Sequence, residues 1–301
     1  MTTKDFLFLN YSFVPNSTFI FQSFEKAGYS CDFVDEHTLR EFRPIHKYKN
    51  VVLYLHEPHT IPITNHLIDN YFQDSFLIQH DDTDFEDVQV WSNRSPDLVM
   101  QREYTEQTKH PYSCPLYPFH FPVPTLYDAN SQEKIYDVVF VGTMTNQRRL
   151  PFIQHMVELA QGPLKNLKWY LDVGPTKFPD PHPCGSPTQT YKQIVNSSKI
   201  GLHYHGNSYD ALRPWELAST KTAIIMPKLR VKSTFDDYMP FKDYCMIDDN
   251  FQDLEEKIVY MLENDRYKDY AERAFKNYND NHTPEKCFEY YHNVVKKYAN
   301  L

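Results

Sequence analysis

A cluster of prolines divides this 301-residue chain into two stretches that each alternate between strand-like and helix-like segments. The five prolines that interrupt the pattern are Pro111, Pro115, Pro118, Pro122 and Pro124. Such a density excludes a regular helix and argues against a central strand. We therefore expect a linker here and a domain boundary near residues 125–134, because a chain of this length is long enough for two cores.

The first stretch is rich in short apolar runs separated by helix-like segments. The runs expected to form strands are residues 5–10, 31–34, 50–56, 75–79 and 97–101. The segments expected to form helices are residues 16–28 and 63–72. Alternation of this kind predicts a mostly parallel sheet with helices on both faces.

The second stretch restarts the same alternation after the prolines. We expect strands at residues 136–141, 168–173, 199–204, 222–226 and 244–247. We expect helices at residues 146–161, 188–197, 213–220, 251–262, 265–278 and 284–298. The helix at 146–161 has an apolar stripe of Ile153, Met156, Val157 and Ala160. The predicted fold class is α/β, with two Rossmann-like domains facing a central cleft and helices at the C-terminal end.

Glycine, charge and cysteine content exclude several classes of protein. Only seven glycines are present, and neither GxGxxG nor GxxxxGK[ST] occurs, so a glycine-rich phosphate loop is not expected. The net charge of −9 argues against a general polyanion-binding protein. The five cysteines form no CxxC pair, which argues against a zinc ribbon or a disulfide framework and fits a reducing compartment.

Targeting and membrane signals are weak in this sequence. The apolar run near the first methionine covers only residues 6–9, which is too short for a signal-peptide core. No stretch approaches the roughly 20 apolar residues of a membrane span. We therefore expect a cytoplasmic protein.

The segment 199–226 carries the residues best suited to binding a ligand. His203 and His205 fall at a predicted strand end, and Arg213 and Glu216 lie on the short helix that follows. In a doubly wound sheet ligands bind beyond the carboxyl ends of the strands. A carboxylate can accept both hydroxyls of a ribose, and a guanidinium can bind a pyrophosphate. The simpler alternatives are a solvated i,i+3 ion pair and strand-end hydrogen bonding; a two-histidine metal site lacks a carboxylate at ligand spacing.

An acidic run after the predicted strand at 75–79 offers a different chemistry. Asp82 and Asp84 match a DxD pattern, in which two carboxylates on a turn bind a divalent metal and a diphosphate. The alternative is a solvated acidic turn or a helix cap.

Three blocks of sequence resemble the GT-B-fold glycosyltransferases. Residues 198–204 (SKIGLHY) and 212–225 (LRPWELASTKTAII) are similar to the donor-site segment of that family, closest to the group-1 branch with the spore-maturation, CgeB-like proteins. Residues 137–143 (DVVFVGT) resemble the strand and turn that open its donor domain, and residues 76–82 (FLIQHDD) resemble its hDD loop. The resemblance implies an acceptor domain at 1–125, a nucleotide-sugar domain at 135–282, and a C-terminal helix at 283–301 that returns to the first domain.

Carried over position by position, the resemblance implies a donor site in the second domain. Glu216 would hold the ribose and Arg213 the diphosphate, with His203 and His205 on the same cleft. The other implied donor contacts are Gly142 and Thr143 for close backbone approach, Arg148 or Arg149 for charge, and Ser219, Thr220 and Lys221 where a helix N-terminus meets phosphate. Asp81 or His80 would be the base that deprotonates the acceptor hydroxyl.

Two departures from the family pattern are visible. Ser208 stands eight positions before Glu216, where retaining enzymes carry a first glutamate. Lys221 or Thr222 replaces the glycine usually found after the helix. These changes leave the stereochemical outcome open.

The function implied is transfer of a sugar from a nucleotide-sugar to an acceptor hydroxyl, without a metal and without a cofactor other than this co-substrate. The acceptor stays open as a glycan, a small molecule or a modified nucleic acid. Three alternatives remain: a DxD metal-dependent transferase using Asp82 and Asp84, a DNA-base-modifying sugar transferase with a local basic groove, and a non-catalytic nucleotide- or sugar-binding module.

Overall fold

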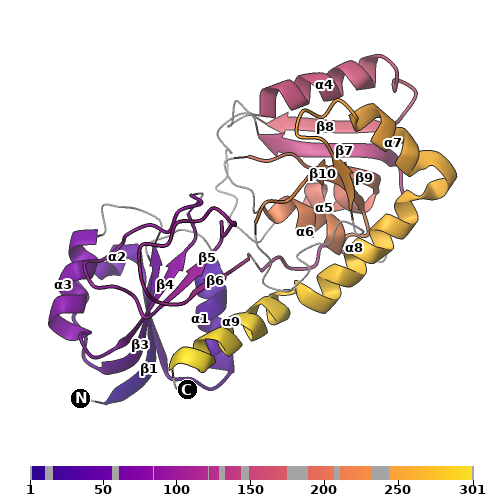
Figure 1. Cartoon of the computed structure of the whole chain (residues 1–301). Helices are drawn as coiled ribbons and strands as arrows, with labels where there is room; N and C mark the ends of the chain where they lie inside the picture. The colour runs from indigo at the N-terminus through magenta and orange to yellow at the C-terminus, as the bar shows by residue number, and fades with distance from the viewer. Residues whose placement is uncertain are drawn as a thin grey trace. The chain divides into compact units, whose positions relative to one another are not determined.

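A computed structural model describes residues 2–10, 16–55, 61–83, 85–120, 122–128, 133–143, 149–174, 189–206, 211–231 and 244–299 (Figure 1). The chain forms two compact units. The first comprises Met1–Phe121, Val231–Thr234 and Cys287–Leu301, and the second comprises Pro122–Arg230 and Phe235–Lys286. Each unit is built on a parallel sheet, as the alternating sequence pattern predicts.

The sheet of the first unit has the strand order β2-β1-β3-β4-β5-β6, and every neighbouring pair is parallel. Its strands are β1 (Thr3–Asn10), β2 (Cys31–Val34), β3 (Lys47–Leu55), β4 (Phe76–Asp81), β5 (Leu98–Gln101) and β6 (Leu116–Pro118). The three-residue strand β6 was not expected, because it lies in the proline cluster. Its place at the sheet edge explains how the chain accommodates Pro118, since an edge strand needs fewer N–H donors.

Alternate side chains of the strands in this sheet serve two cores. On one face, Leu7 and Leu9 pack with residues of α2 (Glu36–Leu39) and α3 (Ile61–Tyr71). On the other face, Phe6 and Phe8 pack with α1 (Asn16–Lys26) and α9 (Pro284–Ala299). Because successive strand residues point to opposite faces, both faces of β1 are buried. The C-terminal helix α9 therefore completes the core of the first unit, through side chains such as Tyr291 and Val295.

The sheet of the second unit has the order β11-β10-β9-β7-β8, again with parallel neighbours throughout. Its strands are β7 (Tyr136–Thr143), β8 (Trp169–Gly174), β9 (Ser198–Leu202), β10 (Ala223–Pro227) and β11 (Cys245–Ile247). Its helices are α4 (Arg149–Gln161), α5 (Gln189–Asn196), α6 (Leu212–Ser219), α7 (Leu254–Leu262) and α8 (Tyr267–Asn281), with a 3-10 turn, η2, at Glu263–Asp265.

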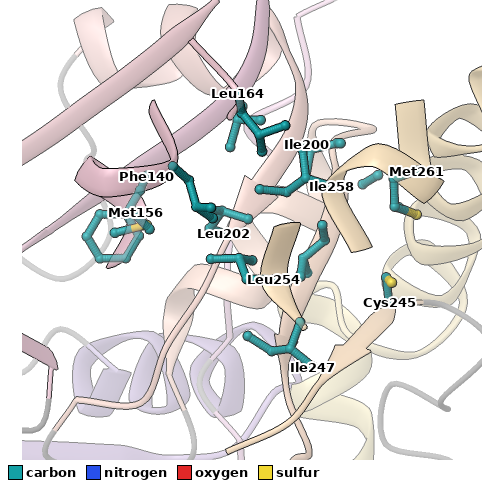
Figure 2. Close-up of a cluster of buried hydrophobic side chains, with 14 of the residues drawn as sticks. Phe140, Met156, Leu164, Ile200, Leu202, Cys245, Ile247, Leu254, Ile258 and Met261 are labelled. Carbon is teal, nitrogen blue, oxygen red and sulfur yellow. The ribbon is translucent and has the colours of Figure 1, made fainter. Parts of the chain in front are cut away.

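The two faces of this second sheet also carry separate cores. Figure 2 shows the face covered by α4 and α7, where Phe140, Ile200 and Leu202 meet Met156 and Ile258. The opposite face packs against α5 and α6, and α8 contributes to both cores.

The predicted apolar stripe of α4 needs a correction. The helix buries Phe152, Ile153, Met156 and Leu159, whereas the expected Val157 and Ala160 are only half-buried. The observed set repeats at i, i+1, i+4 and i+7, the pattern with which a helix covers a sheet.

The strand order of the second unit reverses direction between β7 and β9. From β7 the chain continues to β8 on one side and then returns to β9 on the other. At such a switch point the loops after the two strands diverge and leave a crevice at the carboxyl ends. Ligand-binding residues are therefore expected just after Thr143 and Leu202.

Within the described ranges, no helix is both long and apolar enough to cross a membrane.

Candidate functional site

Arg149, the first residue of α4, lies at the switch point of the second unit. Its Nε donates to the main-chain oxygens of Tyr204 and His205 at 3.2 and 3.3 Å, just beyond the end of β9. A Cβ on Gly206 would lie only 2.7 Å from Nη2 of Arg149, and one on Gly142 would lie 3.8 Å from Nη1. The guanidinium therefore lies between Gly142, near the end of β7, and Gly206, which follows β9.

Arg213 brings a second positive charge to the same region. It lies in the first turn of α6, the end of a helix that carries a partial positive charge. Burial lowers the pKa of the Arg149 guanidinium, and the positive charge of Arg213 lowers it further. Two mutually repelling arginines near the carboxyl edge of a parallel sheet favour an anionic ligand.

Glu216, one turn after Arg213, is the carboxylate of this group. Its Oε2 lies 3.4 Å from Nη1 of Arg213 and accepts a hydrogen bond of 2.9 Å from the hydroxyl of Tyr191 on α5. The ring of Tyr191 also lies under the Arg213 guanidinium, with Cζ 4.4 Å from the ring centroid. The i,i+3 pair that the spacing allows is thus present, but it is held by a tyrosine from another helix instead of being solvated.

His203 and His205 follow β9 and stand beside Arg149. Their ring centroids are 5.8 Å apart at a steep angle, and His203 is 2 % exposed. Burial lowers the pKa of His205 to about 4 and that of His203 well below its ordinary value, with the charge of Arg149 acting in the same direction. Both rings are therefore neutral at pH 7 and can donate a hydrogen bond without adding charge.

A metal site at the histidine pair finds no partner ligands in the described part of the chain. Across those ranges, no group of three or more His, Cys, Asp or Glu side chains is arranged to hold a metal ion. Gly142 and Thr143 end β7 at the expected edge of the sheet. Arg148 and the side chain of Thr143 lie outside the described residues.

The expected place of Ser219, Thr220 and Lys221 at a helix N-terminus is wrong. Ser219 is the last residue of α6 and Thr220 caps its C-terminal end, because the helix begins at Leu212 with Pro214 in its first turn. The hydroxyls of Ser219 and Thr220 donate to the oxygens of Glu216 and Leu217, at 2.8 and 2.9 Å.

The side chain of Lys221 contacts α8 and not Arg149 or Arg213. Its φ is 52°, and its Nζ lies 2.9 Å from Glu272 and 4.9 Å from the ring centroid of Phe275. The positive, N-terminal end of α6 thus lies at Arg213, whereas Ser219, Thr220 and Lys221 lie at its C-terminal end.

His80, expected as a base, is enclosed in the core of the first unit. It is 0 % exposed, stacked between Tyr54 and Tyr291 with ring centroids at 4.2 and 5.6 Å, and touches the edge of Phe119. Burial lowers its pKa to about 3. Its position gives no support to a role in deprotonating an acceptor.

Asp81 ends β4 and holds the loop that follows. Its carboxylate accepts from the N–H and the hydroxyl of Thr83, at 3.2 and 2.7 Å, and from the N–H of Gln89 at 3.0 Å. Burial raises its pKa, although these hydrogen bonds act in the opposite direction. A carboxylate with three internal donors stabilises its own loop more directly than it could serve an acceptor.

Asp82, a metal ligand under the DxD alternative, is committed to a buried ion pair. Its Oδ1 lies 2.9 Å from Nε of Arg102 and its Oδ2 accepts from Tyr54 at 2.9 Å. Arg102 also lies 3.3 Å from Glu103, and all three charged side chains are at most 4 % exposed. Asp84, the second ligand of the DxD pattern, lies outside the described residues.

The sequence analysis did not predict two residues: Arg102, which pairs with Asp82, and Tyr191, which contacts Arg213 and Glu216. Arg102 directly follows β5 at the carboxyl edge of its sheet, so a search for charged residues after each strand would have found it. No local sequence signal marks Tyr191, because its contacts depend on how α5 packs beside α6.

Comparison with known proteins identifies the fold. No family model matches this chain, and no curated protein matches it by sequence. Numerous solved structures resemble it, and three examples, all at low identity, follow. Sucrose-phosphate synthase from Thermosynechococcus elongatus has a TM-score of 0.64 at 10% identity, over 98% of this chain and 99% of that one. Anabaena HepE in complex with UDP has a TM-score of 0.55 at 10% identity, over 97% and 100%.

The pneumococcal O-GlcNAc transferase GtfA, in complex with UDP and GlcNAc, is longer than this chain. It has a TM-score of 0.51 at 11% identity, and the match covers 82% of this chain but only 56% of GtfA. The chain thus spans little more than half of the length of that transferase. The two parallel α/β units have the GT-B fold of these glycosyltransferases, with two Rossmann-like domains, as the sequence resemblance implies.

Proposed function

We propose that this protein is a nucleotide-sugar-dependent glycosyltransferase that binds the donor diphosphate with arginines and a helix N-terminus, without a metal. The single observation that carries the proposal is the convergence of Arg149 and Arg213 at the switch point of the second sheet, where Glu216 pairs with Arg213.

The charges at this site suit a nucleoside diphosphate. Loss of a sugar from such a donor leaves negative charge on the diphosphate, which positioned cations and helix dipoles stabilise. Arg149 and Arg213 supply the cations, and α6 contributes its positive end. The neutral rings of His203 and His205 add hydrogen-bond donors whose protonation does not change near pH 7.

Glu216 is suited to hold the ribose. Both of its contacts with Tyr191 and Arg213 use Oε2, and its Oε1 has no partner among the described residues. A fixed carboxylate oxygen can accept a ribose hydroxyl. The side chain is 12 % exposed, so part of it remains accessible to a ligand.

Structural neighbours support the same donor class. HepE and GtfA are described with UDP bound, and both share the fold of this chain. The sequence blocks at 198–204 and 212–225 support a place in the group-1, spore-maturation branch as part of the proposal. A cytoplasmic location belongs to the proposal too, and it is supported by Cys31, Cys114 and Cys245, which form no disulfide in the described part of the chain.

A thermal-shift screen of nucleotides and nucleotide-sugars, with EDTA or Mn²⁺, tests the proposal. We expect a nucleoside diphosphate to raise the melting temperature of the wild type equally in both buffers, and Glu216→Ala to reduce that shift. A wild type that no nucleotide stabilises would refute the proposal. Release of free nucleotide from the stabilising sugar donor, with and without candidate acceptors, then separates a transferase from a non-catalytic module.

A matched control for the arginine exists in the same unit. Arg266 has its Nη1 3.1 Å from Oε2 of Glu263 at i,i+3 spacing, and its Cζ lies 4.3 Å from the centroid of the Tyr260 ring. This arrangement reproduces the Arg213 contacts on a more exposed surface. Arg213→Gln should weaken nucleotide binding, whereas Arg266→Gln should leave it unchanged.

A further inference from the structure

We propose that Tyr191 is a positioning residue that keeps Arg213 from closing onto Glu216, so that the diphosphate and ribose ligands stay separate. The inference rests on the proposed function, because it concerns the same site. Tyr191 lies on α5 and belongs to no motif that the sequence analysis singled out.

The hydroxyl of Tyr191 occupies the carboxylate oxygen that faces Arg213. It donates to Oε2 of Glu216 at 2.9 Å, while Nη1 of Arg213 stays 3.4 Å from the same oxygen. A charge-assisted N–H···O bond is normally about 2.7–2.9 Å long. The Nη1 atom is buried and makes no hydrogen bond to any described residue. The arginine therefore keeps a donor that a direct pair with Glu216 would consume.

The same pairing without a competing hydroxyl shows the difference. At Arg266 and Glu263 the nitrogen lies 3.1 Å from the oxygen and the contact is a hydrogen bond. Both arginines stack on a tyrosine ring at nearly the same distance, 4.3 and 4.4 Å. The two sites differ in two contacts: the hydroxyl of Tyr191 donates to the carboxylate of Glu216, and Nη1 of Arg266 donates to the main-chain oxygen of Tyr260 at 3.1 Å.

The ring of Tyr191 holds the Arg213 guanidinium in place. An aromatic face attracts a guanidinium and holds its plane, which preserves the in-plane N–H donors for a ligand. The ring thus orients Arg213 while the hydroxyl orients Glu216. One side chain fixes two ligand-binding groups that would otherwise neutralise each other.

A double-mutant cycle tests this division. The affinities of UDP and inorganic pyrophosphate would be measured by calorimetry for the wild type, Tyr191→Phe, Glu216→Gln and the double variant. Tyr191→Phe should weaken both ligands about tenfold, because Oε2 becomes free to capture Arg213. In the Glu216→Gln background the same change should cost less than about twofold, because the attracting charge is gone.

A control variant separates positioning from stability. Tyr278 donates its hydroxyl to the oxygen of Val123 at 2.7 Å and is buried in the same unit. Tyr278→Phe should lower the melting temperature without changing either affinity. If Tyr191→Phe behaves like this control, or weakens binding equally in both Glu216 backgrounds, the positioning role is overturned and the proposed function stands. If the wild type binds no nucleoside diphosphate, the proposed function is overturned as well.

Discussion

Gly206 offers a single-methyl test of the position of Arg149. Its backbone does not adopt the left-handed conformation that favours glycine, so alanine is sterically allowed by the main chain itself. The added Cβ would lie 2.7 Å from Nη2 and 3.1 Å from Cζ of Arg149. A relaxed contact is about 3.5 Å, so the guanidinium must retreat by roughly 0.8 Å.

The expected cost of Gly206→Ala falls on binding and leaves folding nearly unchanged. The group that moves is the end of a flexible side chain, so unfolding should change by less than about 0.5 kcal/mol. The Nε bonds to Tyr204 and His205, already 3.2 and 3.3 Å long, would weaken, and the guanidinium would leave its place at the switch point. Loss of one charge-assisted contact to the diphosphate is worth about 1.5 kcal/mol, or roughly tenfold in UDP affinity.

Gly201→Ala is the matched control, with the opposite expected outcome. Its Cβ would lie 2.5 Å from Cδ2 of Leu217, a side chain that is 1 % exposed and has no room to move. Overpacking of this kind costs about 1–3 kcal/mol of stability. Urea unfolding and UDP calorimetry on both variants check the pair. If Gly206→Ala loses stability and keeps its affinity, or changes neither, the placement of Arg149 at the donor is refuted.

Two further predictions concern the first unit. Because the folded protein holds the pKa of His80 near 3, the unfolded chain binds this proton first as pH falls below about 6.5, and stability is lost toward acid. His80→Phe should reduce the loss of unfolding free energy between pH 7 and pH 5 by up to about 2 kcal/mol in urea titrations. The raised pKa of Asp81 changes stability in the opposite direction, but it does so equally in the wild type and the variant. A variant with the same pH dependence of stability as the wild type would therefore contradict the burial of His80. Arg102→Met should lower the free energy of unfolding by about 3–5 kcal/mol, because it leaves the carboxylates of Asp82 and Glu103 buried without their cation. Since Asp82 already pairs with Arg102, Mn²⁺ should not stabilise the wild type. Stabilisation by Mn²⁺ that Asp82→Asn abolishes would instead restore the DxD interpretation.

Much of the fold follows from local patterns in the sequence. Runs such as 51–55 and 138–141 are β-branched and aromatic, and their alternation with helix-like segments predicts two parallel sheets. The prediction missed β6, because Pro115 and Pro118 argue against a strand unless it lies at an edge. Edge position depends on the pairing of distant segments, which a local pattern does not encode.

The positions of the candidate site residues were predicted less accurately than the helices and strands that carry them. Arg213 and Glu216 could be placed from the helix expected at 213–220 and the carboxyl-end rule for parallel sheets. That same helix argued against Ser219 at an N-terminus; the misplacement came from the resemblance alone. His80 could not be recognised as a core residue, because one of the rings that encloses it, Tyr291, lies more than 200 positions later in the chain.

The central claim is that Arg149 and Arg213 bind the diphosphate of a nucleotide donor without a metal. Calorimetric titration of UDP and uridine in EDTA, for the wild type, Arg149→Gln, Arg213→Gln and the double variant, tests it most directly. We expect the wild type to prefer UDP, each single change to reduce that preference about tenfold, and the double change to abolish it. Equal affinity for UDP and uridine in the wild type, or a preference that survives the loss of both arginines, would contradict the claim.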